Sequence, residues 1–160
     1  MRIQIIAVGR LKPGPERALC ERYLERFQAV ARSWGVQDIK LTELNESNQR
    51  RPADRQAEEA RIIEASFAEG SRRILLDERG KSIGSDEFAG FLRKMRENGT
   101  QNLGIVIGGP DGLAPGLRAN ADLVLSFGKL TIPHQIVRAL MLEQLYRAST
   151  ILTGHPYHRV

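Results

Sequence analysis

The sequence has a single cysteine, few aromatic side chains and no long apolar run. Because Cys20 is alone among 160 residues, the chain can form neither an internal disulfide nor a cysteine cluster for zinc, which is typical of proteins from a reducing compartment. No apolar run approaches the roughly 18 residues of a membrane-spanning helix, and residues 1–8 are too short and too alternating for a signal peptide. These absences predict a soluble, cytoplasmic protein with no membrane contact.

Length and composition describe one globular domain. A chain of 160 residues supports one sizeable core and is too short for two ordinary domains, so we expect a single domain over residues 1–160. With 41% hydrophobic and 27% charged residues, the composition is that of neither a disordered nor a fibrous protein.

The positive charges are mostly arginine. The chain carries 24 Lys and Arg against 19 Asp and Glu, a net charge of +5, and 19 of the cations are Arg. The planar guanidinium group matches phosphate oxygens and stacks on bases, which favours nucleic acid as a partner. The cations are spread along the chain rather than clustered, so Arg-rich codon usage explains them equally well.

Short apolar segments alternate with helical patterns along the chain. Apolar runs predict strands at residues 3–8, 35–44, 73–77, 103–107 and 123–125. Helical spacing predicts helices at residues 16–31, 53–68, 85–97 and 133–149, with Ser85 as a cap. The predicted fold class is α/β, with a mostly parallel sheet and helices on both faces.

Three unusual loops follow the third, fourth and fifth predicted strands. They span residues 77–81, 108–112 and 126–134, and the second is a tight glycine turn. In parallel sheets, ligands bind outside the carboxyl ends of the strands, so we expect these loops to form a binding site. The turn fits neither the dinucleotide nor the triphosphate pattern. Taken alone, it is equally well explained as an ordinary end of a strand.

The last predicted helix has apolar residues all round its axis. Such a helix is buried on more than one side. In a chain of this size the second burying surface is plausibly another copy of the chain, in a two-fold dimer. The alternative is a central helix of the monomer's own core.

The three histidines and the C-terminal tail are candidates for chemistry. No acidic residues lie at ligand spacing beside His134, His155 and His158, so we expect no metal site and favour acid–base or polar roles. Residues 155–159 combine an aromatic ring, two imidazoles and a guanidinium, which suit stacking on a base and contact with phosphate. The alternative is that Tyr157 simply packs on the sheet.

Motifs spread over essentially the whole chain carry a resemblance to a known family. They occupy residues 5–9, 75–81, 85–89, 107–113 and 130–134 and, most specifically, residues 143–148 followed by the tail at 155–158. With these motifs the sequence closely resembles the SPOUT-class ribosomal RNA large subunit methyltransferase H family. Members of that family methylate N3 of a pseudouridine in the helix 69 loop of 23S rRNA.

The resemblance implies a C-terminal trefoil knot in which S-adenosylmethionine binds in a bent form. Gly128 stands where the family commonly has serine. The loops that the family uses for its cofactor are those that the strand-end rule selects. The cofactor contacts map to Leu76, Gly108, Phe127, Gly128, Lys129, Leu130, Thr131 and Ile132.

The resemblance also implies a homodimer, acting on 23S rRNA in the assembled ribosome, in which the tail of one subunit completes the site of the other. The reaction would transfer a methyl group directly to an imide nitrogen that loses its proton. His158 is the first candidate for the base and His134 the second, with Tyr157 holding the target nucleotide. The candidates for contact with RNA phosphate or with the developing negative charge are Arg138, Arg147 and Arg159.

Two other functions remain open from the sequence. A non-enzymatic protein that binds ribosomal RNA would use the arginine-rich surface and need no cofactor. A SPOUT enzyme acting on tRNA would keep the cofactor and change the substrate.

Overall fold

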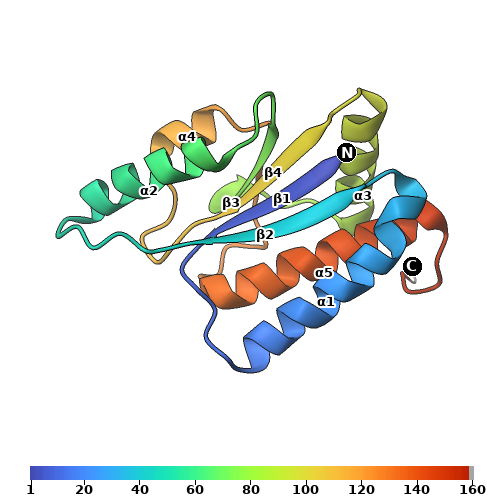
Figure 1. Ribbon diagram of the computed structural model, residues 1–160, viewed down its shortest axis with the longest axis horizontal. Helices are drawn as coiled ribbons and strands as arrows, with labels where there is room; N and C mark the ends of the chain where they lie inside the picture. The colour runs from blue at the N-terminus through green and yellow to red at the C-terminus, as the bar shows by residue number, and fades with distance from the viewer. Residues whose placement is uncertain (159–160) are drawn as a thin grey trace.

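The computed structural model describes residues 1–158 as five strands and five α-helices that mostly alternate (Figure 1). All predicted strands and helices are present, and the structure adds α4 and a 3-10 turn that the sequence did not predict. The largest changes of a boundary are four residues each: the third strand continues to Lys81 rather than ending at Asp77, and the last helix continues to Thr153 rather than ending at Ser149. The strands are β1 (Arg2–Val8), β2 (Asp38–Leu44), β3 (Arg72–Lys81), β4 (Asn102–Ile107) and β5 (Leu123–Leu125); the helices are α1 (Pro15–Ala31), η1 (Arg32–Trp34), α2 (Pro52–Ser66), α3 (Ser85–Glu97), α4 (Pro115–Ala119) and α5 (His134–Thr153).

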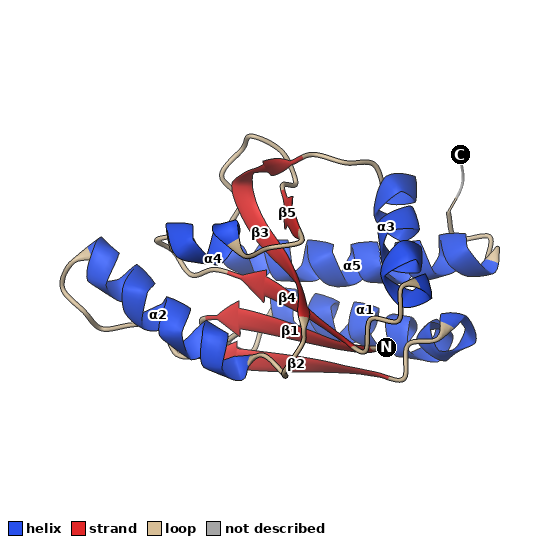
Figure 2. Ribbon diagram, turned by 90° about the horizontal axis from the view of Figure 1, so that it is seen from above, coloured by secondary structure: helices blue, strands red, loops and turns tan. Residues whose placement is uncertain are grey.

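The strands form one sheet in the order β2-β1-β4-β3-β5, and every pairing between neighbours is parallel. Helices α1, α3 and α5 cover one face of the sheet, and α2 and α4 lie on the other (Figures 1 and 2). The predicted fold class, a parallel α/β sheet with helices on both faces, is confirmed. The knot that the family resemblance implies stays a prediction.

Strand β1 shows why both faces are buried. Its successive side chains point alternately to the two faces of the sheet, as the two-residue period of a strand requires. Ile3, Ile5 and Ala7 join the larger core under α1, α3 and α5, whereas Ile6 and Val8 join the smaller core under α2 and α4. The continuous apolar run of a central strand is therefore explained by a cover on each side.

The start of α3 differs from the prediction that Ser85 caps it. The helix begins at Ser85, the preceding Gly84 occupies the capping position, and no side chain caps the helix. The hydroxyl group of Ser85 instead donates a hydrogen bond to Oε1 of Gln144, 2.8 Å away on α5. This contact fixes the start of α3 against the last helix.

Helix α5 is a central helix of the single chain. It packs between α1 and α3 on one face of the sheet, and its buried residues include Met141, Leu142 and Leu145. These contacts account for its apolar character without a second copy of the chain. The homodimer therefore needs support from other observations.

No helix within residues 1–158 combines the length of a membrane span with sufficient apolar character.

Gly80 lies where the end of β3 approaches β5. A Cβ atom built on Gly80 would be 2.6 Å from the carbonyl oxygen of Val124 and 2.8 Å from the carbonyl carbon of Leu125. Backbone atoms of a paired strand cannot move aside as a flexible side chain does. We expect Gly80→Ala to reduce the free energy of unfolding by about 1–3 kcal/mol, as overpacking does, when measured by urea denaturation.

The same substitution in α3 is the matched control. A Cβ on Gly90 has no atom within 4 Å. Replacing a helical glycine by alanine stabilises by roughly 0.5–1 kcal/mol. If Gly80→Ala unfolds at the same urea concentration as Gly90→Ala, the close approach of β3 and β5 is refuted.

Candidate functional site

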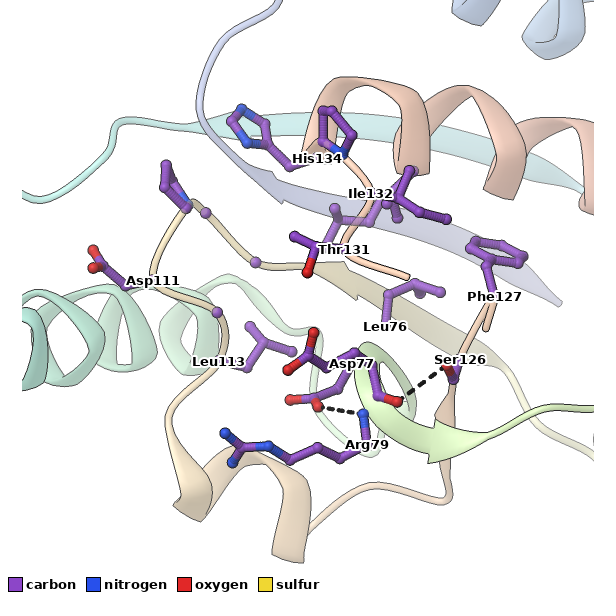
Figure 3. Close-up of a pocket in the computed structure, with 18 of the residues that line it drawn as sticks. Leu76, Asp77, Arg79, Asp111, Leu113, Ser126, Phe127, Thr131, Ile132 and His134 are labelled. Carbon is purple, nitrogen blue, oxygen red and sulfur yellow. Dashed lines mark hydrogen bonds between the residues drawn. The ribbon is translucent and has the colours of Figure 1, made fainter. Parts of the chain in front are cut away.

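A cavity of about 700 Å³ opens at the carboxyl edge of the sheet. It lies between the end of β3, the glycine turn after β4 and the loop from β5 to α5 (Figure 3). The expectation that these three loops meet is confirmed. The volume lies within the ~300–1,000 Å³ typical of small-molecule sites.

The residues predicted to contact the cofactor gather around this cavity, with one exception. Lys129 is exposed and does not line it. Gly128 adopts a φ of 125°, a conformation that favours glycine over the serine common in the family. The predicted residues that line the cavity are Leu76, Gly108, Phe127, Gly128, Leu130, Thr131 and Ile132.

The loop before α5 offers free backbone groups to a ligand. Within the described part of the chain, the N–H groups of residues 129–132 find no acceptor in the protein. The start of the loop is fixed, because the backbone N–H of Ser126 donates to the carbonyl oxygen of Lys81 at 2.9 Å, and the N–H of Gly128 donates to the hydroxyl of Ser126 at 3.1 Å. An apolar cavity with such groups can bind a ligand that combines an apolar ring with hydrogen-bonding edges.

Helix α2 holds the glycine turn in place. Arg55 donates two hydrogen bonds to the carboxylate of Asp111, at 2.6 and 2.9 Å, and Gln56 donates to the carbonyl oxygen of Asp111 at 2.6 Å. The bond from Arg55 lowers the pKa of the Asp111 carboxyl group below its usual value. The sequence analysis missed Arg55 and Gln56, since their helix carries many charged residues and nothing local distinguishes these two.

A second ion pair borders the cavity at the end of β3. Arg118 on α4 donates to Oδ2 of Asp77 at 2.7 Å. Oδ1 of the same carboxylate accepts the backbone N–H of Arg79 at 2.9 Å, as Figure 3 shows. Asp77 is thus satisfied on both oxygens and shapes the irregular last part of β3, where the pairing with β5 shifts register between Leu76 and Lys81. Arg118 was also missed, because α4 is too short to give a helical pattern.

His134 is the one histidine that lines the cavity. It is the first residue of α5, and its ring packs beside Gly9 at the end of β1. Burial lowers the pKa of His134 below its usual value. Within residues 1–158, its ring nitrogens have no hydrogen-bond partner. Because its pKa is lowered, the imidazole that faces the cavity is neutral at neutral pH and can accept a proton.

The tail residues Tyr157 and His158 lie away from this cavity. The hydroxyl group of Tyr157 donates to Glu143 at 3.1 Å, and its ring stacks near Tyr146 with centroids 4.6 Å apart. Glu143 lies nine residues after His134 on α5, about 14 Å along the helix axis. The structure therefore does not bring Tyr157 and His158 together with His134 inside one chain.

The ring of His158 packs near the start of α3. Its Nε2 lies 3.5 Å from Oδ2 of Asp86, both ring nitrogens are buried, and neither has a hydrogen-bond partner among residues 1–158. Tyr157 contacts Glu143 and Tyr146 on α5 rather than the sheet itself, so the alternative prediction that it packs on the sheet is wrong.

The arginines predicted to contact RNA differ in accessibility. Arg147 is partly exposed and lies over the ring of Tyr157 at 4.8 Å while it is bonded to Glu143. Arg138 has no exposed surface and is bonded inside the protein, so it cannot reach a phosphate and the prediction for this residue is wrong. Arg159 lies outside the described residues.

Within residues 1–158, no group of three or more His, Cys, Asp or Glu side chains is arranged to hold a metal ion.

The lowered pKa of His134 predicts how stability depends on pH. As the pH falls through about 6.5, the usual value, the unfolded chain binds a proton on this residue before the folded chain does, so the folded state loses stability. We expect His134→Gln to lose less free energy of unfolding between pH 7.5 and about pH 5 than the wild type, as measured by urea denaturation at each pH. An equal loss in both proteins would contradict the lowered pKa of the half-buried His134.

Comparisons with known proteins agree with this geometry. The family described as "Predicted SPOUT methyltransferase" matches residues 1–158. Proteins named "Ribosomal RNA large subunit methyltransferase H" from Brucella anthropi and Sinorhizobium fredii are 52% and 53% identical over 159 residues, covering 99% of this chain and 99% of each relative.

A solved structure, the SpoU methyltransferase AviRb from Streptomyces viridochromogenes in complex with AdoMet, is 12% identical with a TM-score of 0.42, and the match covers 90% of this chain and 56% of that one. A similarity at that level carries no inference. The family match over all described residues, together with relatives more than half identical along almost their whole length, is decisive: the chain belongs to the SPOUT methyltransferase family.

Proposed function

We propose that this protein is an S-adenosylmethionine-dependent methyltransferase that methylates N3 of a pseudouridine in 23S rRNA, on the assembled ribosome. The observation that carries the proposal is the cavity at the strand ends, lined by Leu76, Gly108 and residues 126–128 and 130–132. The names of its relatives, rRNA large subunit methyltransferases, support the choice of substrate.

The cavity suits S-adenosylmethionine in size and in the groups around it. Its apolar wall, formed by Leu76, Ile107, Leu125 and Phe127, fits an adenine ring. The N–H groups of residues 129–132 are free to bind the edge of that ring or the polar end of the cofactor. When bound, S-adenosylmethionine supplies an electrophilic methyl group on a sulfonium.

The chain's own contribution to the reaction is to orient the imide and remove its proton. A bond forms between N3 and the methyl carbon as the carbon–sulfur bond breaks, the electron pair of that bond stays on sulfur, and the N3 proton must go to a base. His134 lines the cavity and is neutral at neutral pH, so it is the acceptor that a single chain supplies. His158 could act only if the tail of another chain delivered it.

A homodimer would bring the remaining candidates to the site. In one chain the tail lies along α5 at Glu143 and near Asp86, away from the cavity. Two apolar side chains near the mouth of the cavity, Leu130 at 81% and Ile136 at 37% exposure, offer a surface for a partner subunit. In such a dimer, the partner's tail would position the nucleotide, and Arg147 and Arg159 would contact phosphate.

A methylation assay with labelled cofactor tests the proposed function. We expect the purified protein to methylate ribosomes that lack the modification, with the label at N3 of one pseudouridine by mass mapping, and to leave free tRNA unlabelled. Labelling of tRNA alone would favour the tRNA alternative. Binding to ribosomes with no affinity for S-adenosylmethionine would favour the non-enzymatic one.

A substitution in the glycine turn tests whether the cavity binds the cofactor. A Cβ on Gly108 would lie 3.1 Å from the side chain of Leu113, and the remaining atoms of a valine would project into the crowded turn. We expect Gly108→Val to abolish S-adenosylmethionine binding by calorimetry while the far-UV circular dichroism spectrum stays unchanged. Gly116→Ala, which has no atom within 4 Å of its Cβ, should bind normally. Retained binding in Gly108→Val would refute the assigned pocket.

Mixing two inactive variants tests whether the tail acts across a dimer. A chain truncated after Gly154 lacks the tail, and a Gly108→Val chain lacks the pocket. If one intact pocket and one intact tail from different chains suffice, refolding the two together should restore activity, because each mixed dimer then contains one complete site. No recovery despite mixed dimers in native mass spectrometry would show that each chain uses its own tail.

A further inference from the structure

Arg138 is a buried cation one helical turn beyond His134. It lies four residues further along α5, on the same face of the helix, and has no exposed surface. One guanidinium nitrogen pairs with Oε1 of Glu43 at the end of β2, and another donates to the carbonyl oxygen of Gly9, 2.8 Å away. Since a buried charge is costly unless it is paired, these two contacts hold Arg138 firmly in place.

The backbone that Arg138 holds is the surface on which His134 packs. Oε1 of Glu43 also accepts the backbone N–H of Leu11 at 2.9 Å, so the pair fixes the segment after β1 on both sides of Arg10. A Cβ atom on Gly9 would lie 3.2 Å from Nε2 of His134. The imidazole therefore rests directly on a residue whose carbonyl group is bound by Arg138.

We propose that Arg138 is a positioning residue of the site: it fixes Gly9 beside His134 and, as a permanent cation, keeps the imidazole uncharged and able to accept a proton. Arginine stays protonated at any pH at which the protein is folded. A charge away from water acts more strongly on its neighbours than an exposed one, so a second cation at His134 is disfavoured. That His134 accepts the N3 proton rests on the proposed function, whereas its being uncharged does not.

Other charged groups also face His134 or the same cavity. Burial is the main cause of the lowered pKa of His134, Glu46 from the loop after β2 raises it, and Arg138 lowers it. Oε1 of Glu46 would lie 2.9 Å from the same Gly9 Cβ position, so the carboxylate is close to the ring. The remaining carboxylates of the cavity wall that are ion-paired are Asp77 with Arg118 and Asp111 with Arg55.

Histidine titration by NMR tests this role without reference to catalysis. Removing the cation in Arg138→Gln should raise the pKa of His134, and Arg138→Lys, which keeps the charge, should restore it. The double variant Glu43→Gln, Arg138→Gln also removes the cation but leaves no unpaired carboxylate. Because the Glu43 charge is lost with it, we expect an upward shift smaller than that in Arg138→Gln, in a fold without a buried unpaired charge. His134→Gln assigns the resonance.

Two control variants bracket the measurement. Glu46→Gln removes a negative charge beside the ring and should move the pKa of His134 downward. Arg17→Gln, on the exposed surface of α1, should leave it unchanged. A pKa of His134 that stays fixed, or falls, in both variants without the Arg138 cation would overturn the proposal.

The pH dependence of methylation links the charge state to the reaction. In single-turnover assays on ribosomes, the pH at which the methylation rate rises should move upward in the double variant by the same amount as the pKa of His134. If the pKa of His134 shifts but the pH dependence of the rate does not, His134 is not the base and Arg138 has no link to catalysis. A shifted pKa with no methylation in any protein, wild type included, would reject the proposed function and leave the positioning role intact.

Discussion

The parallel direction of every strand is the constraint on which the site depends. Because each of the four pairings is parallel, the chain must cross back over the sheet after every strand, and the helices of those crossovers cover both faces. The carboxyl ends of β3, β4 and β5 then meet at one edge, and with both faces covered, the cavity lies where the chain leaves these ends. The central run at β4 is apolar throughout for the same reason, since it faces a core on each side.

Helix α5 sets the distance between the two groups of candidate residues. It carries His134 at its first residue and runs for 20 residues, about 30 Å, before the tail begins. The tail turns back and binds at Glu143 through Tyr157, which leaves a rigid stretch of helix between the tail and the cavity. In the proposed function, a partner subunit closes this gap, and the same rigid helix would then present a tail to each of the two sites.

The sequence predicts the strands well where burial leaves a local signal. Residues 3–8 and 103–107 are mostly apolar and rich in Ile and Val, and both form strands at nearly the predicted bounds. The extension of β3 beyond Asp77 leaves no such signal, because Asp77 to Lys81 is polar and pairs with β5 only through a shift in register at Lys81 and Leu125. Helix α4, with five residues, is shorter than two helical turns and has no period to detect.

The cavity was predictable in position but only partly in composition. The rule that ligands bind at strand ends selects the three loops without knowledge of side chains. The ion pairs that shape those loops, Arg55 with Asp111 and Arg118 with Asp77, join residues 56 and 41 positions apart. A sequence shows that such charges exist, but the pairing is decided by how the crossovers pack.

Arg138 illustrates the same limit most clearly. An arginine on a largely apolar helix can face solvent, where it would bind phosphate, or turn inward, where it needs partners. Its partners here, Glu43 and Gly9, are 95 and 129 positions away, so only the assembled sheet supplies them. Those partners lie at the ends of β2 and β1, the edge that also carries the cavity. The buried charge of Arg138 is thus compensated by partners at the functional edge of the sheet. Arg138 therefore belongs to the geometry around His134 rather than to the RNA-facing surface.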